Sequence, residues 1–241
     1  TSPQFRPEIA EWCDPSVAGN NASYLSSGLQ NDRHLGRLAL WLKWTEVQAK
    51  LDQVIRSVNQ QTNKANTQGK LQAYADRRGL NQQIEIDEKY NAYIVGSLHG
   101  GTCSGAFLDI AFYLSSLDNI EVFGIFTMMG SPIAYNNKST IVAANGYGAL
   151  VELDYYMQNK TEYDYRLPGT GINFRGKTPF NGVYLVSTHD ESGRAFAISD
   201  QQGNLDLDSL HQMVSIPLFF NILGFDNQTG LFKANSSGRH V

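Results

Sequence analysis

Apolar side chains gather in three short runs that predict β-strands. The runs are Ala92 to Leu98, Glu121 to Met128 and Val183 to Ser187, and they are rich in the β-branched and aromatic residues that strands favour. Between the first two runs, apolar residues recur at helical spacing from residue 107 to residue 114. This order of strand, helix and strand is typical of a parallel sheet. We therefore expect an α/β fold in three layers, with a mostly parallel sheet and helices on both of its faces.

Helical periodicity also appears outside this unit. Asp32 can cap a long helix whose apolar positions run from Leu35 to Val58 on one face. We expect that face to pack against the sheet. Further helices are predicted for Thr140 to Gln158 and for Leu207 to Leu223. Gly146 and Gly148 would each weaken the first of these by roughly 1 kcal/mol relative to alanine, which predicts that another group approaches closely there.

Polar stretches separate these patterns, and we interpret residues 1–241 as a single domain. Residues 1–31 are predicted to be irregular, residues 59–88 to form a surface loop, and residues 224–241 to form a polar tail. Arg33, His34 and Arg37 lie in the first turns of the helix that Asp32 caps, where positive charge opposes the helix dipole. They could bind an anion, but we expect them to be solvated.

The composition excludes several classes of function. The chain is 41% apolar and 17% charged with a formal net charge of −4, as in a soluble globular protein. No dense Lys/Arg block is present, so we expect neither nucleic acid nor an anionic membrane as a partner. Cys13 and Cys103 are too few for a disulfide framework or a Cys-rich zinc site. No metal ligands are therefore assigned, and a cytoplasmic location is expected.

The candidate chemistry lies in residues 99–105, HGGTCSG, which we call the glycine segment. It follows the first predicted strand directly and opens a helix, whose free N–H groups and dipole suit a phosphate. Two other interpretations remain open. The segment could be a close-packed connection whose glycines only let the backbone turn, or Cys103 could be a nucleophile with a pKa lowered by the helix N-terminus. In that case His189 and Glu191 would complete a triad like that of a glutamine amidotransferase.

A family resemblance favours the phosphate interpretation. HGGTCSG resembles the GGGTGSG loop of the tubulin and bacterial cell-division GTPase superfamily, with His99 and Cys103 in place of two glycines. DRHLGRLAL at residues 32–40 and AANGYGALVELDYYM at residues 143–157 are most similar to divergent bacterial tubulin-like proteins. The resemblance implies a tubulin-type, Rossmann-like nucleotide-binding domain that binds GTP or GDP, with Mg²⁺ as a further expected ligand. Hydrolysis of GTP on self-association into filaments or oligomers would belong to the same expectation.

The resemblance also assigns residues to roles. The phosphates would contact His99, Gly100, Gly101, Thr102, Cys103, Ser104 and Gly105. Asn145 and Asp208 match the positions that contact the guanine base, although either residue could instead cap its helix. No glycine-rich strand precedes Pro3, so we expect the first strand and loop of the fold to be lacking, and no hydrolytic residue can be assigned. A cysteine hydrolase and a non-catalytic α/β interaction module remain the alternatives.

Overall fold

The computed structural model describes residues 9, 12–13, 32–79, 83, 89–128, 139–158, 165–167, 173–174, 177–187 and 207–222. Within these ranges β1 (Tyr90–Ser97), β2 (Ile120–Met128) and β5 (Gly182–Ser187) form one sheet in the order β1-β2-β5. Both pairings are parallel. The three strands and their parallel direction are as predicted, and β2 in the middle of the sheet is the most buried of them.

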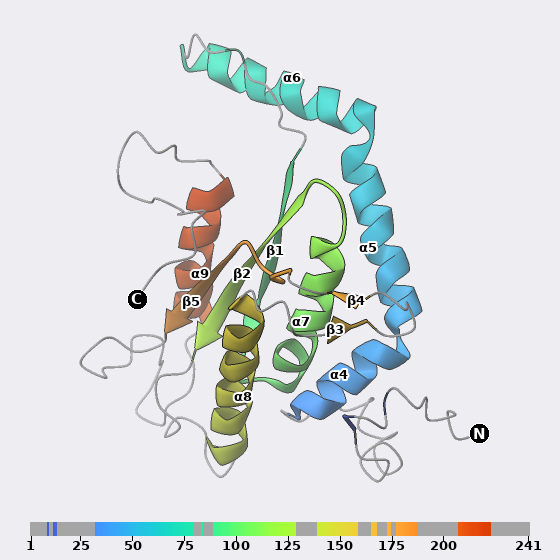
Figure 1. Ribbon diagram of the computed structural model, residues 1–241. Helices are drawn as coiled ribbons and strands as arrows, with labels where there is room; N and C mark the ends of the chain where they lie inside the picture. Colours follow the sequence, from blue (N-terminus) through green and yellow to red (C-terminus); the bar gives the residue numbers. More distant parts are fainter. Residues whose placement is uncertain are drawn as a thin grey trace.

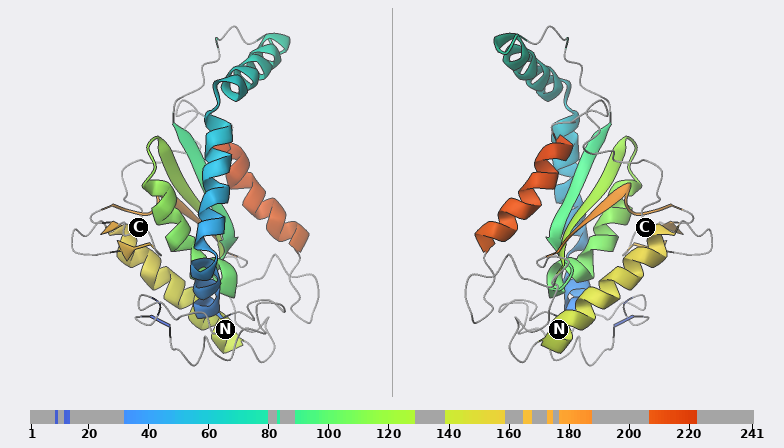
Figure 2. Two further views of the ribbon diagram at one scale, coloured as in Figure 1. Left: turned by 90° about the vertical axis from the view of Figure 1, so that its right-hand side faces the viewer. Right: turned by 90° about the vertical axis from the view of Figure 1, so that its left-hand side faces the viewer.

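Helices cover both faces of this sheet, as expected. α7 (Gly101–Ser115) and α8 (Ser139–Met157) lie on one side, and α9 (Leu207–Ile222) lies on the other (Figure 2). In Figure 1 the three strands point the same way, so their carboxyl ends share one edge of the sheet. The glycine segment follows β1 at this edge, where ligands bind in open parallel sheets.

The core forms between β2 and α7. Phe107 of α7 packs edge-on against Phe126 of β2, with ring centroids 5.2 Å apart, and both rings contact Phe180. Burying each such side chain contributes about 2–3 kcal/mol. A second aromatic group joins α7 to the small antiparallel sheet of β3 (Tyr165–Arg166) and β4 (Asn173–Phe174). These contacts fix α7, and with it the position of the glycine segment.

The long helix predicted from residue 32 is two helices. Asp32 accepts hydrogen bonds from the N–H groups of His34 and Leu35 and caps α4 (Arg33–Leu42), as expected. The chain then turns at Lys43 and continues as α5 (Trp44–Asn59). α4 packs against α7 and not against the sheet, because α7 already covers that face. Its outer side contacts Ile9, Trp12 and Cys13.

The surface loop predicted for residues 59–88 is wrong over most of its length, because residues 61–77 form the helix α6 (Gln61–Arg77). This helix is polar on nearly all sides and largely exposed, so no apolar stripe marked it in the sequence. Its Gln, Lys, Ala and Leu residues favour a helix, and no proline interrupts it. Figure 1 shows α6 at the top, beyond the sheet.

The remaining segment predictions are tested only in part. Residues 224–241 and most of residues 1–31 lie outside the described residues, and the single-domain interpretation stays a prediction. None of the helices in the described ranges is long and apolar enough to cross a membrane.

Candidate functional site

The glycine segment joins the end of β1 to the start of α7. Gly100 is the N-terminal cap residue of α7, with φ −80° and ψ 164°, and no side chain caps the helix. The N–H groups of Gly101, Thr102 and Cys103 stand in the first turn, where an α-helix offers them no partner four residues back. Thr102 is exposed. The segment therefore presents hydrogen-bond donors and the positive end of a helix dipole at the ligand-binding edge of the sheet.

The glycines of the segment serve different purposes. A Cβ added at Gly101 would lie 2.7 Å from the carbonyl oxygen of Asp32, and one at Gly105 would overlap the backbone of Arg33. These two glycines let α4 and α7 approach closely, a contact between helices that the sequence did not predict. A Cβ at Gly100 would meet nothing within 4 Å. Gly100 is thus the glycine of the segment that is open to a ligand.

His99 is a buried anchor of the segment. It is 7% exposed, its backbone N–H donates to Oγ of Ser97 at 3.2 Å, and its imidazole hydrogen-bonds the backbone of Thr127. Burial lowers the pKa of His99, and the bond to Thr127 opposes part of that effect. The ring packs on α8, since a Cβ at Gly146 would lie 2.5 Å from Nε2. The glycine at position 146 led us to expect a group packed closely against this helix, and His99 is that group.

Neither replacement of a motif glycine strains the backbone. Among the described residues, Asn119 is the non-glycine residue with positive φ, so His99 and Cys103 adopt ordinary conformations. The loop therefore has no need of glycine at these two positions to keep its shape.

Asn145 contacts the glycine segment directly. It lies in the second turn of α8 and is 5% exposed, and its Nδ2 donates to the carbonyl oxygen of His99 at 3.2 Å. The prediction that it could cap the helix is wrong, because α8 begins six residues earlier, at Ser139. The structure thus joins two residues that the sequence assigned separately, one to the phosphates and one to the base.

Cys103 does not have the properties of a nucleophile. Burial raises the pKa of its thiol to about 11, whereas the nucleophile interpretation expected a lowered pKa. The sulfur packs against β1, since a Cβ at Gly96 would lie 2.5 Å from Sγ. A thiol with this pKa is protonated at neutral pH. His189 and Glu191, the other members of the alternative triad, lie outside the described residues.

Asp208 lies in the first turn of α9 and is exposed. It is not the cap residue, because the helix begins one residue before it. A carboxylate in the first turn still interacts favourably with the helix dipole. Its role in base binding stays a prediction.

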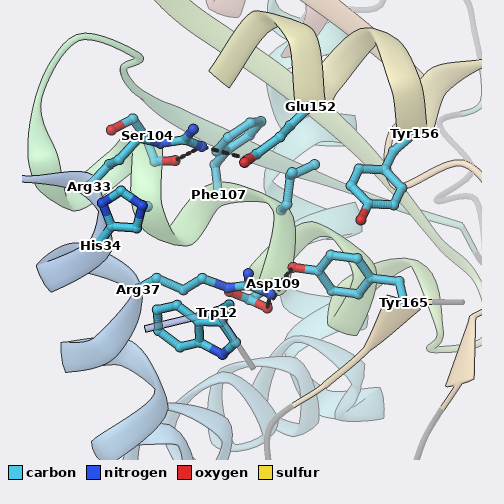
Figure 3. Close-up of a pocket in the computed structure, with 12 residues that line it drawn as sticks. Trp12, Arg33, His34, Arg37, Ser104, Phe107, Asp109, Glu152, Tyr156 and Tyr165 are labelled. Atoms are coloured by element: carbon cyan, nitrogen blue, oxygen red, sulfur yellow. Dashed lines mark hydrogen bonds and ion pairs between the residues drawn. The ribbon is translucent and has the colours of Figure 1, made fainter. Parts of the chain in front are cut away.

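A pocket of about 180 Å³ lies beside the glycine segment, between α4, α7 and α8 (Figure 3). Two arginines of α4 line it, and both are paired. Arg33 bonds Glu152 of α8 at 2.5 Å and donates to the carbonyl oxygen of Ser104 at 3.2 Å. With Arg33 17% exposed and Arg37 29% exposed, the expectation of solvated arginines is wrong, and only His34 meets it.

Arg37 belongs to a buried network that the sequence analysis missed. It bonds Asp109 of α7 at 3.2 Å, and Tyr165 donates its hydroxyl to the same carboxylate at 2.6 Å. Burial alone would lower the pKa of Arg37, but the interactions with Asp109, Tyr165 and Glu152 together more than offset it, so the pKa lies above its usual value. The sequence contains a signal for this network, because Asp109 is the only charged residue in the largely apolar segment that forms α7. Since these cations are neutralised, the pocket is a poorer anion site than the glycine segment.

Comparison with known proteins supports the resemblance. A family model described as "Tubulin like" matches residues 1–219. No curated protein and no solved structure is significantly similar to the chain.

Proposed function

The chain belongs to the tubulin-like family, and from this premise we propose that it binds a guanine nucleotide, GTP or GDP, with the phosphates at the glycine segment. The observation that carries the proposal is the start of α7, which is uncapped and follows β1 at the carboxyl edge of a parallel sheet. Family membership supports a guanine nucleotide as the ligand. The geometry of the segment supports the binding of its phosphates there.

The local contacts support a phosphate at this place. The N–H groups of Gly101, Thr102 and Cys103 lack α-helical partners, and the space around Gly100 lets a ligand approach the backbone. The first turn carries no acidic residue that would repel an anion. Several N–H donors directed at one phosphate form charge-assisted hydrogen bonds, which are about twice as strong as neutral ones.

A magnesium ion would depend on the nucleotide for most of its ligands. The described residues contain no group of three or more His, Cys, Asp or Glu side chains that could hold a metal. Mg²⁺ is commonly bound through substrate phosphates and water, so the proposal includes it with GTP.

The finer features of the family are part of the same proposal. Self-association and hydrolysis of GTP are proposed together, with no hydrolytic residue assigned. Neither Cys13 nor Cys103 is in a disulfide bond, which fits a reducing compartment, so we propose a cytoplasmic location.

The test is calorimetric titration of the full-length protein with GDP, GTP and ATP. We expect saturable binding with a preference for the guanine nucleotides. Gly100→Val should raise the Kd for GDP at least about tenfold, a loss of ~1.4 kcal/mol, because its side chain would occupy the space that the phosphates need. Gly69→Val in α6 is the matched control, since a Cβ there also meets nothing within 4 Å. Absence of saturable binding to GDP and GTP at millimolar concentration would refute the proposal.

A further inference from the structure

The bond between Asn145 and His99 links α8 to the glycine segment. It spans 46 residues of sequence and is fully buried. The bonds of Ser97 and Thr127 to the same residue come from the ends of β1 and β2. His99 is therefore held from three directions, and Asn145 supplies the contact that comes from α8.

The acceptor in this bond is part of the segment's backbone. The carbonyl of His99 and the N–H of Gly100 belong to one planar peptide group. The next residue is a glycine in open space, so its own φ and ψ restrain that plane weakly. Because Asn145 holds the carbonyl, it fixes the orientation of the peptide that leads into Gly100, the cap residue of α7. The donors of the first helical turn begin one peptide further on, at Gly101.

This geometry conflicts with a role in reading the base. An asparagine that recognises guanine must present its amide N–H and its carbonyl oxygen to the ligand together. Here Nδ2 donates to the protein's own backbone, and the residue is 5% exposed. The second N–H and the carbonyl oxygen of this side chain could contact a base only if the side chain left its buried position.

We propose that Asn145 is a positioning residue that clamps the carbonyl of His99 and so sets the geometry of the phosphate site, without contacting the guanine base. The inference rests on the proposed nucleotide binding and assigns to Asn145 a different role from the one the family resemblance implied. If this is so, loss of the Asn145 bond weakens the binding of every ligand that carries the phosphates, whatever base is attached.

Asn145→Asp separates the two roles. The carboxylate has no N–H to donate and places an oxygen against the His99 carbonyl, so the clamp is lost. A base-reading residue would instead lose the N–H that it donates to guanine, so in that role the change would alter the ratio of GDP to ADP affinity and leave pyrophosphate binding unaffected. Asn145→Ala removes the same bond without adding a charge and serves if the Asp variant does not fold. Asn181→Ala is the control, because Asn181 accepts a backbone bond from Val122 at 2.8 Å, near the start of β2.

The experiment is titration of the full-length variants with inorganic pyrophosphate, GDP and ADP. We expect Asn145→Asp to raise the Kd for pyrophosphate and for GDP by the same factor, about tenfold for the loss of one buried hydrogen bond. The ratio of GDP to ADP affinity should not change, and the Asn181→Ala variant should bind like the wild type. Unchanged pyrophosphate binding, or a changed ratio of GDP to ADP affinity, would overturn the inference.

Amide hydrogen exchange of the ligand-free proteins tests the clamp without any nucleotide. We expect the peptide covering residues 98–103 to exchange faster in Asn145→Asp than in Asn181→Ala or the wild type. If the wild type binds neither GDP nor pyrophosphate, the proposed function fails, and the exchange data alone decide whether the clamp exists. Equal exchange in all three proteins would contradict the clamp.

Discussion

Single residues in the glycine segment have roles that their positions in the motif do not disclose. His99 and Cys103 stand where the family motif has glycine, and each fills space between packed elements. The imidazole of His99 lies between the end of β2 and α8. The thiol of Cys103 lies against β1 at Gly96. Both side chains thus stabilise the turn from its buried side and leave its exposed side to Gly100 and Thr102.

The burial of Cys103 predicts low reactivity and a loss of stability in alkali. Its pKa is raised from 9.0 to about 11, so the folded protein holds the thiol proton more tightly than the unfolded chain does. The resulting stabilisation is complete below about pH 9 and is lost as the pH rises through about 11. Iodoacetamide at pH 8 should modify Cys103 about 100-fold more slowly in the folded protein, reflecting two pKa units.

Peptide mass spectrometry measures this rate and separates Cys103 from Cys13. The urea-unfolded chain is the reference for an accessible thiol. Rapid modification of the folded protein at neutral pH would restore the nucleophile interpretation.

At the scale of elements, the crossing of α4 and α7 determines the shape of the site. Three glycines allow this crossing, since a Cβ at Gly36 would overlap the carbonyl of Gly101 and those at Gly101 and Gly105 would meet the backbone of α4. Bonds from Arg33 and Arg37 to α7 and α8 then hold the helices together. The glycines that resembled a ligand motif therefore also form a helix-packing surface.

Gly105→Ala tests this packing role. The new Cβ would overlap the backbone of Arg33 and lie 2.7 Å from the N atom of Arg37, and a backbone cannot rotate away as a side chain can. We expect the free energy of unfolding to fall by about 1–3 kcal/mol, measured by urea titration. Gly69→Ala in α6 is the control and should leave stability unchanged or raise it by up to about 1 kcal/mol. Equal unfolding midpoints for Gly105→Ala and the wild type would show that α4 and α7 are not closely packed.

At the scale of the whole molecule, a three-layer body carries a helix that adds little to its core. The body is held by one apolar cluster that includes residues of α4, α7, β2 and α8. α6 contributes to none of this cluster, and most of its residues are exposed. A long exposed helix belongs to the least stable parts of a fold, because few apolar contacts oppose its local unfolding.

Gly69→Pro tests the independence of α6. Proline in a helix interior costs about 3 kcal/mol or more, so α6 should break near its middle and the helical circular dichroism signal should fall. The free energy of unfolding, measured by urea titration with the fluorescence of Trp41 and Trp44, which lie in the body, should change by no more than about 0.5 kcal/mol. A large change in that free energy would mean that α6 stabilises the body.

Local pattern by itself determined the strands, the Asp32 cap and the place of the glycine segment. These features depend on neighbouring residues, because burial of a short apolar run, a cap bond and a glycine turn all arise within a few positions of the chain. The existence of α6 was missed for the same reason, since a helix without an apolar face leaves no periodic signal.

The tertiary structure alone decided which groups meet across long stretches of sequence. It paired Arg37 with Asp109, packed α4 on α7 and brought Asn145 to the carbonyl of His99. A sequence pattern shows that a residue is polar or small, but not which partner satisfies it, because that partner is selected by the packing of elements 46 to 72 residues apart. The roles of the residues at this site follow from those long-range contacts, since buried polar groups must find partners wherever the fold places them.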